Sequence, residues 1–300
     1  MKQPVQIKRK RTGLRIPGRL RMPVEQAWRE LWFQCALRFG DHDRSLPDFA
    51  IVGCQRCGTT SLFRYLARHP LILPSIKKEV HYFDREENFA RGEYWYRAHF
   101  PARKRLARAQ RRSGQRVLTG EATPDYLFRE AALERMARLW SPETRLIVLL
   151  RNPVDRAYSQ YQNALRKGQI STSFEMYVAT ELAVHFPESG VKRPPSPQPK
   201  FSFLRRGIYI DQLRALDRYL PSNPKLVLIS EEFFVEPAKF LDQVLAFLGL
   251  PSAHLGSLHP HNELRYSAAL APALRQQLTE FFGPYNRSLS EYLGRDLGWS

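Results

Sequence analysis

A glycine-bounded turn early in the sequence carries the residue types that bind phosphate. Gly53 and Gly58 enclose four residues and are followed by three hydroxyl side chains, those of Thr59, Thr60 and Ser61. A buried-strand pattern ends at the first glycine and a helical pattern begins after the second. Backbone N–H groups and the positive end of the helix should therefore converge on one anion. The turn predicts a phosphate site.

The same turn lacks the features that a nucleotide-hydrolysing enzyme needs. Such an enzyme has lysine directly after the second glycine, where this chain has Thr59, and the basic residue here is Arg56 inside the turn. The apolar run 145–150 ends in Arg151 and not in an acid that could hold magnesium. A kinase or ATPase is therefore disfavoured. The residues favour a nucleotide phosphate bound by arginines without a metal.

Elements of the right type surround this turn. Strand patterns cover 48–53, 71–73, 117–120, 145–150 and 225–229. Helical patterns cover 60–68, 94–99, 129–139, 153–167, 174–181, 208–219, 237–248 and 272–281. Strands that alternate with helices imply a mostly parallel central sheet with helices on both faces. The predicted fold class is α/β, a three-layer sandwich similar to that of P-loop proteins.

Charge is concentrated in two stretches of the 300-residue chain, whose formal net charge is +18. Residues 1–40 and 101–120 hold most of the excess, and the latter contain no acid. Such stretches attract a polyanion, which could be nucleic acid, an anionic lipid surface, an acidic polysaccharide or a phosphate-rich cofactor. We interpret residues 1–47 as a basic arm with an amphipathic helix around 24–38, and residues 48–300 as one α/β domain.

No apolar run approaches the roughly 20 residues that span a bilayer, and no signal-peptide pattern follows the basic start. Three cysteines are too few for a disulfide scaffold and fit a reducing compartment. Cys54 and Cys57 have no second pair to complete a zinc site, so we interpret them as small residues of a crowded turn. We expect a cytoplasmic protein without a transmembrane segment, whose basic arm could still touch a membrane surface.

Several segments, in order, resemble sulfotransferases that use 3′-phosphoadenosine 5′-phosphosulfate (PAPS), and in particular the heparan sulfate glucosaminyl branch. The turn 53–62 is similar to the family's 5′-phosphosulfate loop, and 150–161 is similar to its 3′-phosphate motif. Five further segments resemble this branch: Lys78–Asp84, Gly92–Arg97, Gly120–Tyr126, Arg206–Tyr209 and Pro284–Trp299. The resemblance covers about residues 48–300.

The resemblance implies transfer of a sulfuryl group to a hydroxyl or amine of a carbohydrate. Glu79 corresponds to the branch's general base, and His81 could orient Glu79 or the acceptor, or act as the base itself. Asp84 is a candidate carboxylate that either binds the acceptor or supports the residues that do. Arg56 stands where the family usually has lysine, and it should offset charge on the leaving oxygen. No metal is expected, since cations and N–H dipoles can do this work.

The resemblance also implies a PAPS-binding set. The candidates in the loop are Arg56, Cys57, Gly58, Thr59, Thr60 and Ser61. Arg151 and Ser159 correspond to the family's 3′-phosphate ligands, and Tyr209 falls near its adenine-contacting stretch. Arg265 corresponds to a late basic residue near the phosphates, although Leu264 replaces the glycine that the family has beside it.

Two departures bear on the acceptor. The animal heparan sulfate enzymes carry lysine where this chain has Ala122, and their late cysteine pair is missing. The alternative acceptor is therefore a small molecule or a lipid, and the sequence does not distinguish between these two. A nucleic-acid- or membrane-surface-binding protein is the alternative from a different class, but it leaves the phosphate motifs unexplained.

Overall fold

The computed structural model describes residues 43–186, 202–253 and 269–299, together with Phe33, Gln34, Leu37 and Gly256. The chain divides into two compact units, 1–40 and 41–300. Most of the helix expected around 24–38, and with it most of the basic arm, lies outside the described residues, as does Arg265. Phe33, Gln34 and Leu37 are helical. The second unit contains the elements described below.

A parallel sheet forms the centre of the second unit. Its strands are β1 (Phe49–Gly53), β2 (Gly120–Ala122), β3 (Arg145–Leu150) and β4 (Lys225–Ile229), in the spatial order β2-β1-β3-β4. All neighbouring strands are parallel, and every residue of β1 is buried, which is the pattern of a sheet covered on both faces. The predicted α/β class is confirmed.

Two of the expected strands differ from prediction. The run 71–73 contributes only an isolated bridge between Ile72 and Leu118, and the strand expected over 117–120 is instead β2 at 120–122. Residues 71–79 nevertheless follow 118–122 closely. The N–H groups of Leu73, Ser75 and Glu79 donate to the carbonyls of Leu118, Gly120 and Ala122. This segment ends at the residues expected to do the chemistry.

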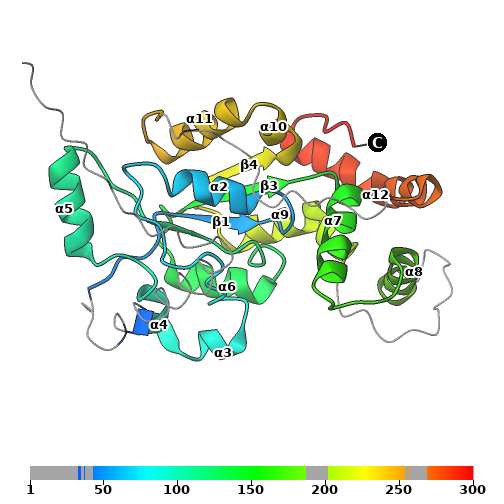
Figure 1. The fold of residues 1–300 in the computed structure, drawn as a ribbon, viewed down its shortest axis with the longest axis horizontal. Helices are drawn as coiled ribbons and strands as arrows, with labels where there is room; N and C mark the ends of the chain where they lie inside the picture. The colour runs from blue at the N-terminus through cyan, green and yellow to red at the C-terminus, as the bar shows by residue number, and fades with distance from the viewer. Residues whose placement is uncertain are drawn as a thin grey trace, which may run out of the picture. The chain divides into compact units, whose positions relative to one another are not determined.

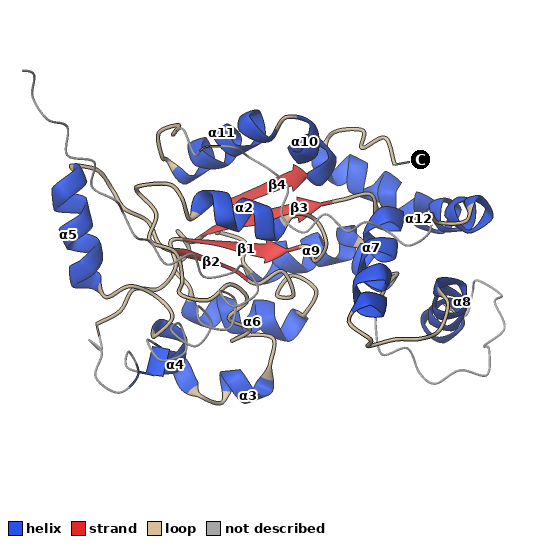
Figure 2. Cartoon of the chain, in the orientation of Figure 1, coloured by secondary structure: helices blue, strands red, loops and turns tan. Residues whose placement is uncertain are grey.

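Helices cover both faces of the sheet (Figures 1 and 2). On one side lie α2 (Thr59–Leu66), α10 (Ser230–Val235) and α11 (Pro237–Leu248), and on the other lie α6 (Glu130–Leu139) and α9 (Tyr209–Tyr219). The remaining helices are α3 (Glu86–Phe89), α4 (Gly92–Arg97), α5 (Arg103–Ser113), α7 (Pro153–Arg166), α8 (Phe174–His185) and α12 (Pro272–Leu293).

The last helix is much longer than the sequence pattern indicates. Helix α12 was expected to end at residue 281 but continues to Leu293 with Pro284 inside it. A proline removes one helical hydrogen bond and leaves a carbonyl without its partner. Pro284 and Glu280, the residue four positions earlier, are both exposed, so water can take the place of the missing donor.

Candidate active site

The phosphate loop, residues 53–58, connects β1 directly to α2. A side chain at Gly53 would place its Cβ 2.6 Å from the side chain of Leu127, so only glycine fits beside that packed residue. Gly58 precedes the helix with a φ of 85°, a left-handed conformation that glycine adopts without strain. The two glycines thus let the chain turn sharply from the sheet into the helix.

The hydroxyl residues of the loop differ in accessibility. Thr59 and Ser61 are buried, whereas Thr60 is only partly covered. Cys57 is also fully buried, and its carbonyl accepts a hydrogen bond of 2.6 Å from Ser230 Oγ. Burial raises the pKa of the neighbouring Cys54 thiol, which suits a packing role. The buried residues Cys57, Thr59 and Ser61 therefore offer an anion their backbone more than their side chains.

Three predicted phosphate ligands come together although they lie far apart in sequence. Arg56 Nε donates to Ser159 Oγ at 3.1 Å. Arg151 Nη1 lies 3.5 Å from the Arg56 carbonyl oxygen. Arg56 has a φ of 70°, which is uncommon for a residue with a side chain. The structure thus builds a cationic cluster at the carboxyl ends of β1 and β3.

Tyr209 lies beneath this cluster. Its hydroxyl donates to the Arg151 carbonyl at 2.8 Å and lies 3.9 Å from Cys57 Sγ. The residue is 1% exposed, and burial raises its pKa well above the usual value. A buried ring offers no face to a bound nucleotide in this conformation. Its contacts instead hold the end of β3 and the loop together.

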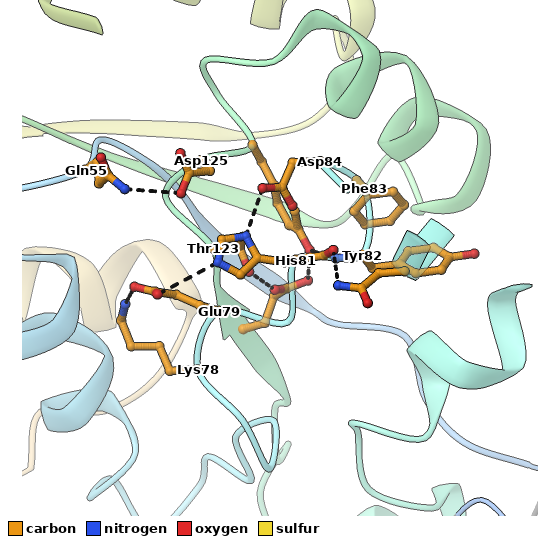
Figure 3. Close-up of polar contacts among 12 residues, drawn as sticks. Gln55, Lys78, Glu79, His81, Tyr82, Phe83, Asp84, Thr123 and Asp125 are labelled. Carbon is orange, nitrogen blue, oxygen red and sulfur yellow. Dashed lines mark hydrogen bonds and ion pairs between the residues drawn. The ribbon is translucent and has the colours of Figure 1, made fainter. Parts of the chain in front are cut away.

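The segment from Lys78 to Asp84 forms a chain of charged contacts (Figure 3). Lys78 Nζ pairs with Glu79 Oε1. His81 Nε2 lies 3.9 Å from Glu79 Oε2, and His81 Nδ1 lies 2.8 Å from Asp84 Oδ2. The segment is not extended, because Glu79 and His81 have φ values of 62° and 55°. The side chains of Glu79 and His81 still meet.

Exposure separates the roles that these side chains can take. The side chain of Glu79 is 45% exposed, whereas those of His81 and Asp84 are 11% and 6% exposed. Within the described part of the chain, Asp84 Oδ1 is buried and accepts no hydrogen bond. Glu79 is therefore the carboxylate that a ligand reaches most directly, and Asp84 supports His81 from behind.

Glu121 is a buried carboxyl that the sequence reasoning did not single out. It accepts hydrogen bonds from Tyr96 Oη at 2.5 Å and Thr123 Oγ1 at 2.7 Å. Tyr126 Oη donates to it at 3.4 Å and accepts from the Tyr82 N–H at 3.1 Å. Burial raises the pKa of Glu121 to about 7. This network supports the segment 78–84 from below.

Asp125, a second carboxylate that the sequence reasoning did not single out, links the segment 78–84 to the phosphate loop. Asp125 Oδ2 accepts from Gln55 Nε2 at 3.3 Å, and its Oδ1 pairs with Arg206 Nη1 at 2.7 Å. Ligand atoms of His81, Asp84 and Asp125 all lie within 4.8 Å of one another. Gln55 lies in the segment 53–62 and Arg206 in the segment 206–209, both of which carry the resemblance, and this was the available signal. The two halves of the site are therefore adjacent.

Comparison with known proteins agrees with this geometry. Residues 46–266 match the sulfotransferase domain family.

This chain belongs to the sulfotransferase family.

Individual relatives extend the match. The chain is 30% identical over 286 residues to human heparan sulfate glucosamine 3-O-sulfotransferase 6, covering 88% of this chain and 76% of the relative. It is 28% identical over 287 residues to mouse heparan sulfate glucosamine 3-O-sulfotransferase 3A1, covering 88% of this chain and 67% of the relative. The chain thus spans about two thirds to three quarters of these proteins.

A solved structure supports the fold. The crystal structure of a sulfotransferase from Alicyclobacillus acidocaldarius superposes with a TM-score of 0.62 at 30% identity, covering 85% of this chain and 99% of that one. The predicted enzyme class, a sulfotransferase, is confirmed, and membership of the family implies PAPS as the donor. No helix within the described residues is long and apolar enough to cross a membrane.

Proposed function

We propose that this sulfotransferase transfers a sulfuryl group from PAPS to a hydroxyl or amine of a carbohydrate, with Glu79 as the general base. The observation that supports it most is the adjacency of the two halves of the site. Asp125 bonds to Gln55 of the phosphate loop, and it also lies within 4.8 Å of the His81 and Asp84 ligand atoms. Glu79 is thus connected to the loop through His81 and Asp125.

The residues of the loop fit an anionic nucleotide. When bound, PAPS supplies the sulfuryl group and a phosphate leaving group. Arg56, Arg151 and Ser159 form a cluster of cations and a hydroxyl at the strand ends, and Thr60 is the most accessible hydroxyl of the following helix. Arg56 can offset negative charge on the leaving oxygen, the kind of electrostatic stabilisation that usually contributes most.

The charged chain 78–84 fits proton removal from the acceptor. Glu79 is the exposed carboxylate, and Lys78 beside it pairs with its Oε1. His81 directs Nε2 towards Glu79 while Asp84 holds Nδ1. With Nδ1–H donated to Asp84, Nε2 is an acceptor, so His81 is the second candidate for the base. Substitution of each residue in turn distinguishes the two.

We also propose that the reaction needs no metal. The carboxyl end of β3 carries Arg151 where a magnesium ligand would stand, and Arg56 provides a cation inside the loop. His81, Asp84 and Asp125 have metal-ligand spacing, but His81 and Asp84 pair with each other, and Asp125 pairs with Arg206. Full activity in a chelator is the expected result. Loss of activity that only a divalent cation restores contradicts the proposal.

The proposed acceptor follows from the relatives, whose names specify heparan sulfate glucosamine. Ala122, which stands where the animal enzymes have lysine, is fully buried in β2. The cation at that position is therefore absent, and other residues must recognise the acceptor. A small molecule or a lipid remains the alternative acceptor.

The decisive experiment separates donor from acceptor. A thermal shift assay should show stabilisation by adenosine 3′,5′-bisphosphate and little by ATP–magnesium. Transfer from labelled PAPS is then measured with heparan sulfate, a phenol and a sterol as acceptors. Stabilisation by ATP–magnesium alone contradicts the donor assignment, and transfer only to the phenol or the sterol contradicts the carbohydrate assignment.

A further inference from the structure

Helix α5 presents a uniformly basic face that the proposed chemistry does not use. Five of its exposed residues are cations at helical spacing, so they share one side of the helix: Lys104, Arg105, Arg108, Arg111 and Arg112. Leu106 is the helix's buried residue. No acidic residue occurs from Tyr94 to Gly120, so neither the helix nor its flanks neutralise the face.

Internal pairing does not account for the four arginines of this face. Arg103 pairs with Asp43 at 3.0 Å, and Arg116 pairs with Asp48 at 3.0 Å. Within the described residues, Arg105, Arg108, Arg111 and Arg112 make no hydrogen bond or ion pair through their side chains. Arg108 lies three or four positions from Lys104, Arg105, Arg111 and Arg112, a spacing at which like charges repel on a helix. The isolated protein gains nothing from this arrangement.

The helix lies at the end of the sheet where β1 begins. The Arg103 N–H donates to the Asp43 carbonyl, and Arg44 bridges to Ala102. Figure 1 shows α5 at that end, away from the end where β1 runs into the phosphate loop. The cations therefore do not line the catalytic centre, and a ligand that touches both regions must be extended.

The backbone that connects α5 to the residues around Glu79 indicates along which line such a ligand would lie. Residues 71–79 run beside 118–122, from Leu118, which follows α5 in the chain, to Ala122 beside Glu79. At about 3.3 Å per residue this is a path of about 13 Å. Lys77, near its catalytic end, is exposed, and Arg116, near its other end, has a 60% exposed side chain. Cations thus stand at both ends of the path.

We propose that α5 binds a distal part of an anionic carbohydrate chain whose reacting unit lies at Glu79. This inference rests on the proposed function and adds that the acceptor is a long polymer bearing carboxylates or sulfates. Arginine, which provides four of the five cations on this face, pairs with such groups through two parallel hydrogen bonds.

The composition of the helix disfavours other polyanions. An interfacial membrane helix exposes large apolar side chains that enter the lipid, and α5 exposes none of the large hydrophobic residues found on the described surface. Single-stranded nucleic acid is bound through aromatic side chains on which bases stack, and α5 has no aromatic residue. Charge without these groups matches a flexible polysaccharide.

The test compares long and short acceptors in a variant with R105Q, R108Q, R111Q and R112Q. Glutamine keeps a helix propensity close to that of arginine. Exposed ion pairs are individually weak, so losing all four should raise KM for heparan sulfate about tenfold. We expect an unchanged kcat, an unchanged KM for a tetrasaccharide of the same polymer and unchanged bisphosphate affinity.

A matched control removes the same charge elsewhere. Arg166, Lys167, Arg214 and Arg218 are exposed on α7, its C-terminal end and α9, and their replacement by glutamine should leave KM for both acceptors unchanged. An equal rise in KM in the control, or an equal rise for the tetrasaccharide, overturns the assignment of α5.

Binding measurements distinguish failure of this inference from failure of the proposed function. Calorimetry should show that heparan sulfate binds more weakly to the fourfold α5 variant than to wild type, whether or not the wild type sulfates it. If wild type binds heparan sulfate through α5 but does not sulfate it, only the acceptor chemistry proposed at Glu79 is rejected. Equal binding by wild type and variant overturns the inference, as does α5-dependent binding of anionic phospholipid vesicles or oligonucleotides in place of heparan sulfate.

The single substitution Arg108→Glu distinguishes a role of Arg108 in ligand binding from a role in stabilising the fold. It replaces repulsive pairs with attractive ones on the helix, so Tm should rise while heparan sulfate affinity falls. A fall in both would indicate that Arg108 stabilises the fold, and unchanged affinity would overturn the inference.

Discussion

The phosphate loop and the segment 78–84 lie next to each other but are held in different ways. The loop is formed by its immediate neighbours in sequence: β1 ends at Gly53, and α2 starts at Thr59. The segment 78–84 belongs to no strand of the sheet, and hydrogen bonds to residues outside the segment position it. Tyr82 bonds to Tyr126, and the backbone of His81 is held by Asn88.

This difference predicts different consequences of mutation. A substitution among the loop cations should change nucleotide affinity and leave the fold intact, because the strand, turn and helix remain. A substitution in the network below 78–84 should change stability and its pH dependence, because that network is buried. Four substitutions test the contrast.

The largest expected effect is that of Glu79→Gln, which keeps the shape of the side chain but removes its ability to accept a proton. A positioned acid–base group contributes about 10²–10⁴-fold, so kcat should fall by that order while bisphosphate affinity is retained. His81→Ala should cost less. The opposite ranking, measured by steady-state kinetics, would identify His81 as the base.

The second effect concerns the buried carboxyl of Glu121, whose folded pKa is raised from 4.5 to about 7 by burial. A raised pKa means that the folded state binds this proton more tightly than the unfolded state does. The free energy that Glu121 contributes to folding is therefore complete below a pH of about 4.5 and is lost as the pH rises towards 7. Each pKa unit corresponds to about 1.4 kcal/mol. The free energy of unfolding of wild type minus that of Glu121→Gln should fall by about 3 kcal/mol across this window.

Denaturant unfolding at several pH values provides the measurement. His99→Gln serves as a control of opposite sign, since burial lowers the pKa of His99 to about 4. The free energy that neutral His99 contributes to folding is lost as the pH falls from 6.5 towards 4. A flat difference curve for Glu121→Gln would show that Glu121 is not protonated in the folded protein.

The third effect is on cofactor affinity. Arg151→Ala removes a charge-assisted contact worth about 1.5–3 kcal/mol, so the Kd of adenosine 3′,5′-bisphosphate should rise about 10–150-fold. We expect Tm without ligand to change little, because the side chain is only partly buried. Unchanged calorimetric affinity would remove Arg151 from the binding set.

The smallest effect is that of Tyr209→Phe, which deletes the hydroxyl that bonds to the Arg151 carbonyl. Losing one such bond should lower the free energy of unfolding by about 0.5–1.5 kcal/mol. Bisphosphate affinity should fall less than in Arg151→Ala, since Tyr209 acts only through the strand end. A larger loss of affinity than in Arg151→Ala would mean that the ring contacts the nucleotide after all.

The sequence by itself determined the parts of the site that are local. The phosphate loop could be predicted because strand, glycine turn and helix are contiguous, and their backbone groups converge wherever the rest of the chain lies. The parallel sheet followed from the alternation of strands and helices. The segment 78–84 was found through resemblance and not through periodicity, because its residues form no regular element.

Only the tertiary structure decided which distant groups support these residues. Glu121, Asp125 and Arg206 appear in the sequence as ordinary motif residues, and Tyr209 appears as a candidate ligand. β2 packs against α2, and its Glu121 is buried against Tyr96 of α4. Asp125 meets Gln55 across 70 positions of the sequence. Partners so far apart are set by how the layers pack, which local spacing does not encode.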